Sequence, residues 1–146
     1  MGFSIDHSVR FHETDAAGVV YFAHSLTFCH SAYEASLAAA GVNLVDFFTT
    51  DSLAYPIVHA AIDYRRPMRC GDRITIYLTP RRLDISTFEV HYRIYDACNS
   101  ASLLAEACTR HLCIDRQHRS RQPLASPLEQ WLQLWAADAG KDGKEG

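Results

Sequence analysis

The sequence lacks the features that mark several large classes of protein. It contains no run of about 18 apolar residues, the length that a membrane-spanning helix requires, and it begins without the basic and apolar segments of a secretory signal. Charge of one sign is not in excess, because 14 Lys and Arg against 17 Asp and Glu give a formal net charge of −3. We therefore expect a cytoplasmic protein that binds neither nucleic acid nor a membrane surface.

The cysteines exclude two further classes. There are five, an odd number, and none forms a Cys-x-x-Cys pair, so neither a disulfide framework nor a zinc ribbon is indicated. The grouping nearest to metal-ligand spacing is Cys29, His30 and Glu34, which has no further partner in the sequence. We expect reduced and mostly buried thiols, no bound metal ion and no cofactor.

What the chain does contain fits one domain. Its 146 residues are 48% hydrophobic and 21% charged, which is enough for one good core, and no repeat, low-complexity segment or linker divides them. We expect a single domain over residues 1–146, with a core over about 3–118, a C-terminal helix over about 126–138 and a frayed tail over 140–146.

The hydrophobic pattern predicts an α+β fold. Apolar and polar residues alternate over 3–11, which is typical of a half-buried strand, and apolar residues recur with helical spacing over 23–40, before Gly41. Four further strands are predicted over 56–64, 73–79, 88–95 and 103–114. This order favours an antiparallel sheet of about five strands wrapped around one long central helix. Such a sheet leaves an open edge, so we expect a homo-oligomer, either a dimer or a dimer of dimers (homotetramer).

Asp15 lies between the first strand and the long helix, in a turn that contains Gly18. The first N–H groups of a helix have no acceptor within the helix and carry the positive end of its dipole, so they can stabilise the oxyanion formed by attack on a thioester. A carboxylate just before them can attack the carbonyl or activate a water molecule. Alternatively, Asp15 only caps the turn, as Asp often does. The local sequence leaves both readings open.

Two separated motifs carry a family resemblance. The segment Thr14-Asp15-Ala16-Ala17-Gly18-Val19-Val20-Tyr21-Phe22 resembles the Asp-x-x-Gly-x-Val motif of the 4-hydroxybenzoyl-CoA thioesterase family, and Arg66-Pro67-Met68-Arg69-Cys70-Gly71-Asp72 is similar to its Arg-Pro-x-x-x-Gly-Asp turn. The likeness spans roughly residues 5–118. It implies the hotdog fold and hydrolysis of an acyl-CoA thioester, in which coenzyme A is part of the substrate. Within the family the chain most resembles the 1,4-dihydroxy-2-naphthoyl-CoA hydrolases of phylloquinone biosynthesis, which implies an aryl-CoA substrate.

The resemblance assigns roles around the first motif. The family's essential carboxylate corresponds to Asp15, acting either as a nucleophile or as a general base, and we leave that choice open. The oxyanion donor corresponds to the backbone N–H of Phe22. Gly18 would let the loop approach the thioester, and Tyr21 would line the site.

The residues expected to contact the aryl group are His30, Glu34, Tyr55 and His59. His30 could meet a ring hydroxyl, with Glu34 one turn further along the helix orienting its imidazole. The alternatives are that His30 is a buried packing residue and that Glu34 is a second carboxylate of the mechanism.

The CoA phosphates are assigned less directly. Some members of the family have a basic cluster before Ser-x-Phe, where this chain has Leu83-Asp84-Ile85. The remaining candidates are arginines, whose forked guanidinium group matches phosphate geometry, and they are Arg65, Arg66, Arg69, Arg81 and Arg82.

Other functions fit the same fold, because fold alone does not determine chemistry. They are another thioesterase, acting on 4-hydroxybenzoyl-CoA or a short-chain acyl-CoA; a hydratase or dehydratase acting on acyl-CoA or acyl-carrier protein; and a non-catalytic acyl-CoA-binding domain in which Asp15 only shapes a loop.

Overall fold

Five strands form one antiparallel sheet in the computed structural model, which describes residues 2–50 and 52–136. The order across the sheet is β1-β4-β5-β6-β3, so β1 and β3 are its edges. The strands are β1 (Phe3–Ser8), β3 (Ile57–Tyr64), β4 (Arg73–Arg82), β5 (Thr87–Asp96) and β6 (Asn99–Leu112). The tail predicted over 140–146 lies outside the described residues.

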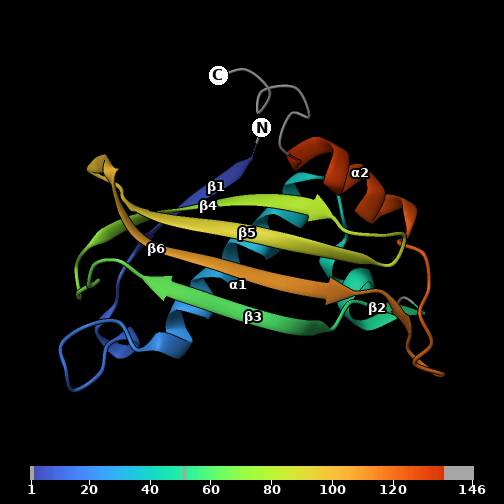
Figure 1. Cartoon of the computed structure of the whole chain (residues 1–146), viewed down its shortest axis with the longest axis horizontal. Coiled ribbons are helices and arrows are strands. Elements are labelled where there is room, and N and C mark those ends of the chain that lie inside the picture. The colour runs from blue at the N-terminus through green and yellow to red at the C-terminus, as the bar shows by residue number, and fades with distance from the viewer. Residues whose placement is uncertain (1, 51, 137–146) are drawn as a thin grey trace, which may run out of the picture.

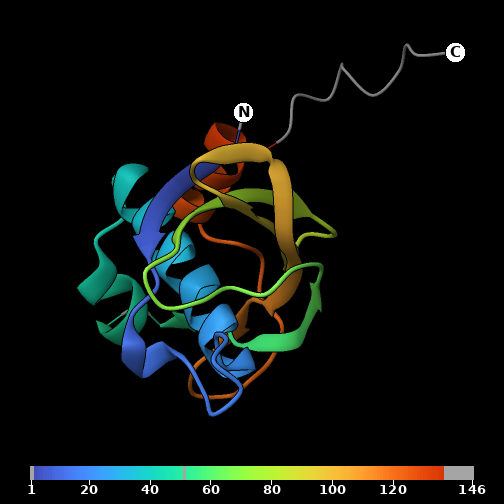
Figure 2. The same ribbon diagram turned by 90° about the vertical axis from the view of Figure 1, so that its left-hand side faces the viewer.

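The helix α1 (Phe22–Ala39) packs against one face of this sheet, which curls around it (Figures 1 and 2). Because side chains alternate along each strand, β4 and β5 turn an unbroken set of apolar residues toward the helix. These inward residues are all fully buried: Ile74, Ile76, Leu78, Phe88, Val90, Tyr92 and Ile94. The predicted α+β architecture is thus confirmed.

A second helix, α2 (Ser126–Trp135), covers the end of the core beside β4. Its two tryptophans reach α1: Trp131 Nε1 donates to the Ser36 hydroxyl at 2.9 Å, and Trp135 Nε1 donates to the Ser36 carbonyl at 3.1 Å. These bonds satisfy polar groups that would otherwise be buried unpaired. No helix within the described ranges is long and apolar enough to cross a membrane.

Shorter elements fill the connections. A 3₁₀ turn, η1 (Phe11–Glu13), follows β1, a π-helical segment, η2 (Asp46–Thr50), follows α1, and β2 (Leu53–Ala54) pairs with β7 (Ile114–Asp115). The strand predicted over 3–11 therefore ends early, at Ser8. The reason is local, because the Glu13 carboxylate accepts the backbone N–H of Arg10 and closes the turn.

Candidate active site

The Asp15 loop is a tight turn held by its own backbone. Asp15 N–H donates to the Val19 carbonyl at 3.0 Å, and Gly18 N–H donates to the Asp15 carbonyl at 3.0 Å. The Asp15 carboxylate accepts the N–H of Ala17 at 2.8 Å. Gly18 has φ +78°, and a Cβ there would meet nothing within 4 Å, so this position needs glycine for its backbone conformation rather than for space.

The second motif holds this loop in place. In the turn between β3 and β4, the Met68 carbonyl accepts Val20 N–H and the Asp72 carbonyl accepts Val9 N–H, both at 2.8 Å. It also donates Gly71 N–H to the Val9 carbonyl at 2.8 Å. The Arg-Pro-x-x-x-Gly-Asp segment thus supports both the chain that enters the Asp15 loop and the chain that leaves it.

Glu13 is a further anchor, which sequence reasoning missed. Its side chain is buried, and its carboxylate accepts His7 Nε2 at 2.9 and 3.1 Å and Arg10 N–H at 2.7 Å, while its carbonyl accepts Tyr21 N–H at 2.9 Å. Burial by itself raises the pKa of Glu13, but the hydrogen bonds from His7 and Arg10 outweigh it and lower that pKa. An ionised Glu13 therefore ties β1 to both sides of the Asp15 loop.

The start of α1 has no side-chain cap among the described residues. Tyr21 occupies the N-cap position with extended backbone, and its side chain does not bond back to the helix. The Tyr21 carbonyl accepts the His24 N–H at 2.9 Å, which leaves the N–H groups of Phe22 and Ala23, the first two residues of the helix, to an acceptor from outside the helix. Together with the helix dipole, this is the arrangement that oxyanion stabilisation requires.

A cavity of about 390 Å³, which we call the Asp15 cavity, opens beside this loop. Tyr64 on β3 closes one side by donating its hydroxyl to the Phe22 carbonyl at 3.1 Å. Arg65 lines it while paired with Glu106 at 3.0 Å, and Arg66 lines it with no ion pair to any described residue. The full lining is Asp15, Val19, Val20, Phe22, Tyr64, Arg65, Arg66, Pro67 and Met68.

A second cavity, also of about 390 Å³, lies further along α1, and we call it the His30 cavity. Its lining joins α1, η2, β3 and β6, and consists of Thr27, His30, Ser31, Tyr33, Glu34, Phe48, Tyr55, Ile57 and His111. The structure therefore brings together three of the four predicted aryl contacts, His30, Glu34 and Tyr55. It adds Tyr33 and His111, which the sequence did not single out.

The two added residues are buried polar groups. The Tyr33 hydroxyl has no hydrogen-bond partner within the described part of the chain, and His111 bonds through Nε2 to the Thr109 hydroxyl at 2.8 Å. Burial lowers the pKa of His111 to about 4, and burial also lowers the pKa of His30. Both imidazoles are therefore neutral near pH 7, which suits a neutral polar partner such as a ring hydroxyl. The one signal in the sequence that could have pointed to Tyr33 is its position three residues after His30, which places both residues on the same face of a helix.

Four predicted contacts, His59, Arg69, Arg81 and Arg82, line neither of the two cavities. His59 on β3 stands opposite Arg110. Arg81 and Arg82 lie at the end of β4 near α2, where Arg82 pairs with Glu129. Their roles remain predictions.

Comparisons with known proteins bear on the family and the fold of this chain. Residues 9–135 match the thioesterase-like superfamily. The chain belongs to this superfamily. It is 48% identical over 139 residues to a 1,4-dihydroxy-2-naphthoyl-CoA hydrolase of Nostoc punctiforme, covering 95% of this chain and 92% of that one. A hydrolase of the same name from Rippkaea orientalis is 50% identical over 125 residues, which are 86% of this chain and 91% of that one.

The fold is shared with a solved thioesterase. The crystal structure of a 1,4-dihydroxy-2-naphthoyl-CoA thioesterase from Synechocystis superposes with a TM-score of 0.86 at 38% identity, over 91% of this chain and 96% of that one. The predicted hotdog fold and thioesterase class are thereby confirmed for this superfamily member.

Proposed function

We propose that the chain hydrolyses an aryl-CoA thioester, and that this substrate is 1,4-dihydroxy-2-naphthoyl-CoA, on the route to phylloquinone. The observation that carries the proposal is the placement of the Asp15 carboxylate in a cavity beside an uncapped helix N-terminus. The substrate comes from the two relatives named above, whose identity to this chain extends over nearly its whole length.

In the proposed reaction, the thioester carbonyl lies between Asp15 and the start of α1. Attack by the carboxylate gives a mixed anhydride that water then hydrolyses, or the carboxylate takes a proton from a water molecule that attacks directly. Both routes break the C–S bond, release the CoA thiol and leave the aryl acid. Both place the oxyanion at the Phe22 N–H, and neither needs a cofactor.

The His30 cavity is the proposed place of the hydroxylated rings. Its volume lies within the range of small-molecule sites, and aromatic side chains make up much of its lining. His30 and Tyr33 would bond the ring hydroxyls. The Tyr33 hydroxyl is buried without a partner among the described residues, and a buried polar group gains most from one. Arg66, together with Arg65, is the proposed contact for the CoA phosphates, because both line the Asp15 cavity.

We propose a homodimer formed through β3, which is the basis for a dimer of dimers. This edge strand is exposed along most of its length and carries apolar groups, with Val58 55% exposed and Tyr64 44% exposed. Lysine and proline, which protect many natural edges, are absent from Ile57–Tyr64, where Asp63 is the one acidic residue. Pairing β3 with a second β3 would satisfy its free backbone groups.

This pairing would also join the two kinds of cavity. In an antiparallel pair, the Ile57 end of one β3 lies beside the Tyr64 end of the other. Ile57 lines the His30 cavity and Tyr64 lines the Asp15 cavity. Each proposed site would then take its carboxylate from one chain and its ring-binding groups from the other. The cytoplasm is the proposed compartment, on the ground that all five cysteines are free thiols.

The experiment that tests the substrate is a hydrolysis panel on the purified chain. We expect kcat/KM to be highest for 1,4-dihydroxy-2-naphthoyl-CoA, lower for 4-hydroxybenzoyl-CoA and unsubstituted benzoyl-CoA, and lowest for straight-chain acyl-CoA. Preference for an aliphatic chain would overturn the aryl assignment. No turnover of any thioester, with CoA binding retained, would instead favour the binding-domain alternative.

The oligomer is tested by sedimentation. Val58→Lys should shift the chain toward monomer and reduce hydrolysis, while Ile85→Lys, at a loop residue that is 69% exposed, should change neither. A Val58→Lys chain that stays dimeric and active would rule out the β3 interface.

A further inference from the structure

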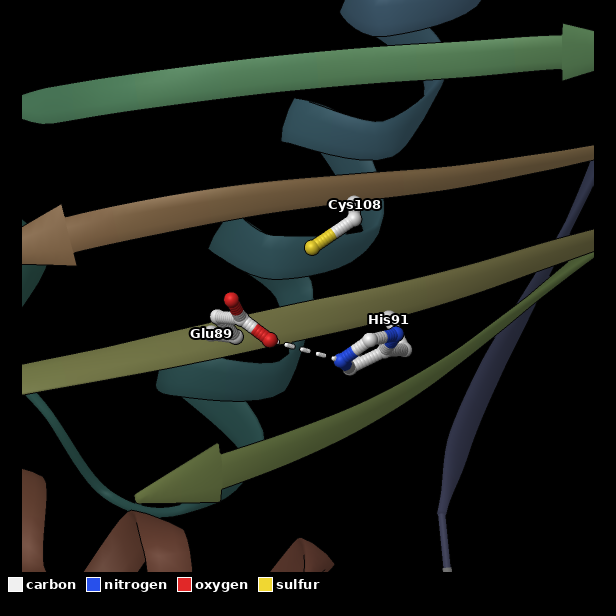
Figure 3. A group of neighbouring side chains, drawn as sticks. All are labelled: Glu89, His91 and Cys108. Carbon is white, nitrogen blue, oxygen red and sulfur yellow. Dashed lines mark hydrogen bonds and ion pairs between the residues drawn. The ribbon is translucent and has the colours of Figure 1, made fainter. Parts of the chain in front are cut away.

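The face of the sheet turned away from α1 carries a cluster that the hydrolysis does not use. Glu89 and His91 lie two residues apart on β5, so their side chains share this face, and Cys108 stands directly opposite His91 on the neighbouring β6. Figure 3 shows the three side chains converging in front of the sheet, with α1 behind it. One donor atom from each residue, oxygen, nitrogen and sulfur, lies within 4.8 Å of the others.

The cluster is held in place by hydrogen bonds. One oxygen of Glu89, Oε1, accepts Nε and Nη2 of Arg110 at 3.1 and 2.8 Å. The other, Oε2, contacts His91 Nε2 at 3.0 Å. Arg110 therefore fixes the carboxylate so that Oε2 points toward the imidazole and the thiol.

We propose that Glu89, His91 and Cys108 form a binding site for a divalent transition-metal ion of the zinc type. Carboxylate, imidazole and thiolate are the ligands that Zn²⁺ takes in proteins, at about 2.0–2.3 Å from each donor atom. The 3.0 Å separation of Oε2 and Nε2 is close to what two ligands of one such ion require, so the ion would take the place of the proton between them. Cys108 Sγ would be the third ligand.

The surroundings supply the rest of the coordination shell. Metal-bound carboxylates are usually held by an outer hydrogen-bond donor, and Arg110 fills that position. A shallow cavity of about 470 Å³ reaches His91 and Cys108 and leaves room for a water molecule as the fourth ligand. The ion would clamp β5 to β6 on the face opposite the helix.

The other thiols of the chain lack this setting. Cys29 and Cys113 are buried, and Cys70 and Cys98 are exposed. Cys108 is the cysteine that the described residues group with both a histidine and a carboxylate. This grouping arises from the pairing of β5 with β6, because no contiguous stretch of the sequence contains it. The sequence therefore provided no reason to expect a metal site here.

The test uses the full chain, reduced and freed of metal with a chelator, and titrated with Co²⁺ and then Zn²⁺. Co²⁺ should bind at one ion per chain and give the absorption band of a thiolate–cobalt bond, and Zn²⁺ should displace it. Cys108→Ala should abolish the band, and His91→Ala and Glu89→Gln should each weaken Zn²⁺ binding about tenfold or more. The matched control is Cys98→Ala, at an exposed thiol in the β5–β6 turn, which should bind as the unaltered chain does.

Thermal unfolding gives a readout that does not depend on cobalt. Zn²⁺ should raise the Tm of the unaltered chain and of Cys98→Ala but not that of Cys108→Ala, because only a folded state that binds the ion is stabilised. The proposal fails if the unaltered chain shows no saturable binding or if Cys108→Ala keeps the cobalt band. It also fails if His91→Ala and Glu89→Gln both bind as the unaltered chain does.

Discussion

The Asp15 cavity and the His30 cavity have the same volume but are built in different ways. The first is made by a loop, a helix start and a turn whose main-chain groups bond to one another, so backbone geometry fixes it. The second is made by side chains from four elements, and two of these side chains, Tyr33 and His111, are buried polar groups. Under the proposed function, the reaction would depend on backbone shape in the Asp15 cavity, while substrate choice would depend on side chains in the His30 cavity.

The largest expected effect is in the Asp15 cavity. Asp15→Asn keeps a side-chain oxygen for the Ala17 N–H, so the loop should stay folded. Hydrolysis should fall at least roughly 1,000-fold, because the amide is neither a nucleophile nor a base. Release of free CoA thiol measures the rate, and binding of a non-hydrolysable analogue should be unchanged. The control is Asp6→Asn, at an exposed carboxylate on β1. Near-normal turnover in Asp15→Asn would rule out the mechanism.

The next effect is on stability, and it comes from the His30 cavity. His111 has a pKa of about 4 in the fold, below the value of about 6.5 for a solvated histidine. Between these two pH values, only the unfolded chain binds a proton at His111. The free energy of unfolding is therefore unaffected by this group above about pH 6.5 and falls by about 3 kcal/mol as the pH is lowered toward 4. Urea unfolding at pH 7.5 and pH 4.5 measures it.

The carboxylates also lose stability in acid, so a variant must isolate the histidine. His111→Gln can keep a bond to the Thr109 hydroxyl and does not titrate, so its loss between the two pH values should be smaller. An equal loss in both proteins would mean that His111 does not contribute.

A smaller effect concerns selectivity. If His30 bonds a ring hydroxyl, His30→Ala should lower kcat/KM about tenfold for hydroxyaryl-CoA and hardly at all for benzoyl-CoA. Ser31→Ala is the matched control, since its hydroxyl lines the same cavity but donates to the Thr27 carbonyl at 3.1 Å. Equal losses on both substrates would show that His30 serves packing.

The smallest effect is expected for Tyr33→Phe. Its hydroxyl has no partner among the described residues, so removing it should leave the free energy of unfolding unchanged or raise it by about 1 kcal/mol. The kcat/KM for hydroxyaryl-CoA should fall a few-fold, and that for benzoyl-CoA should not change. The same substitution at Tyr92, which is buried outside this cavity, should leave the ratio of the two substrates unaltered.

The sequence predicted the first cavity better than the second for a physical reason. Asp15, Gly18 and Phe22 form one short segment, and the Arg66–Asp72 turn is a second, so each can be recognised without knowing which strands pair. His111 joins the His30 cavity only because β6 pairs with β3 and places it opposite Ile57. A local sequence pattern does not specify which residues of two distant strands stand opposite each other. The roles of all these residues stay predictions until they are measured.

The same limit explains two other differences. Glu13 lies two residues before Asp15 in the sequence, but it anchors the loop through its hydrogen bond with His7 on β1, which the sequence does not reveal. Glu89, His91 and Cys108 come together only through the alignment of β5 with β6. By contrast, the helix predicted over 23–40 is found at Phe22–Ala39, because its apolar spacing is a local property.

The contact between α2 and Ser36 has a consequence for how the chain is made. Ser36 is completely buried, and its hydroxyl and carbonyl receive Trp131 and Trp135, which are among the last residues of the described chain to be synthesised. While the ribosome is still adding residues, this side of α1 has no cover. A nascent chain that already contains all five sheet strands is therefore still exposed to aggregation, chaperones and proteases. Completion of the core therefore waits for the synthesis of α2.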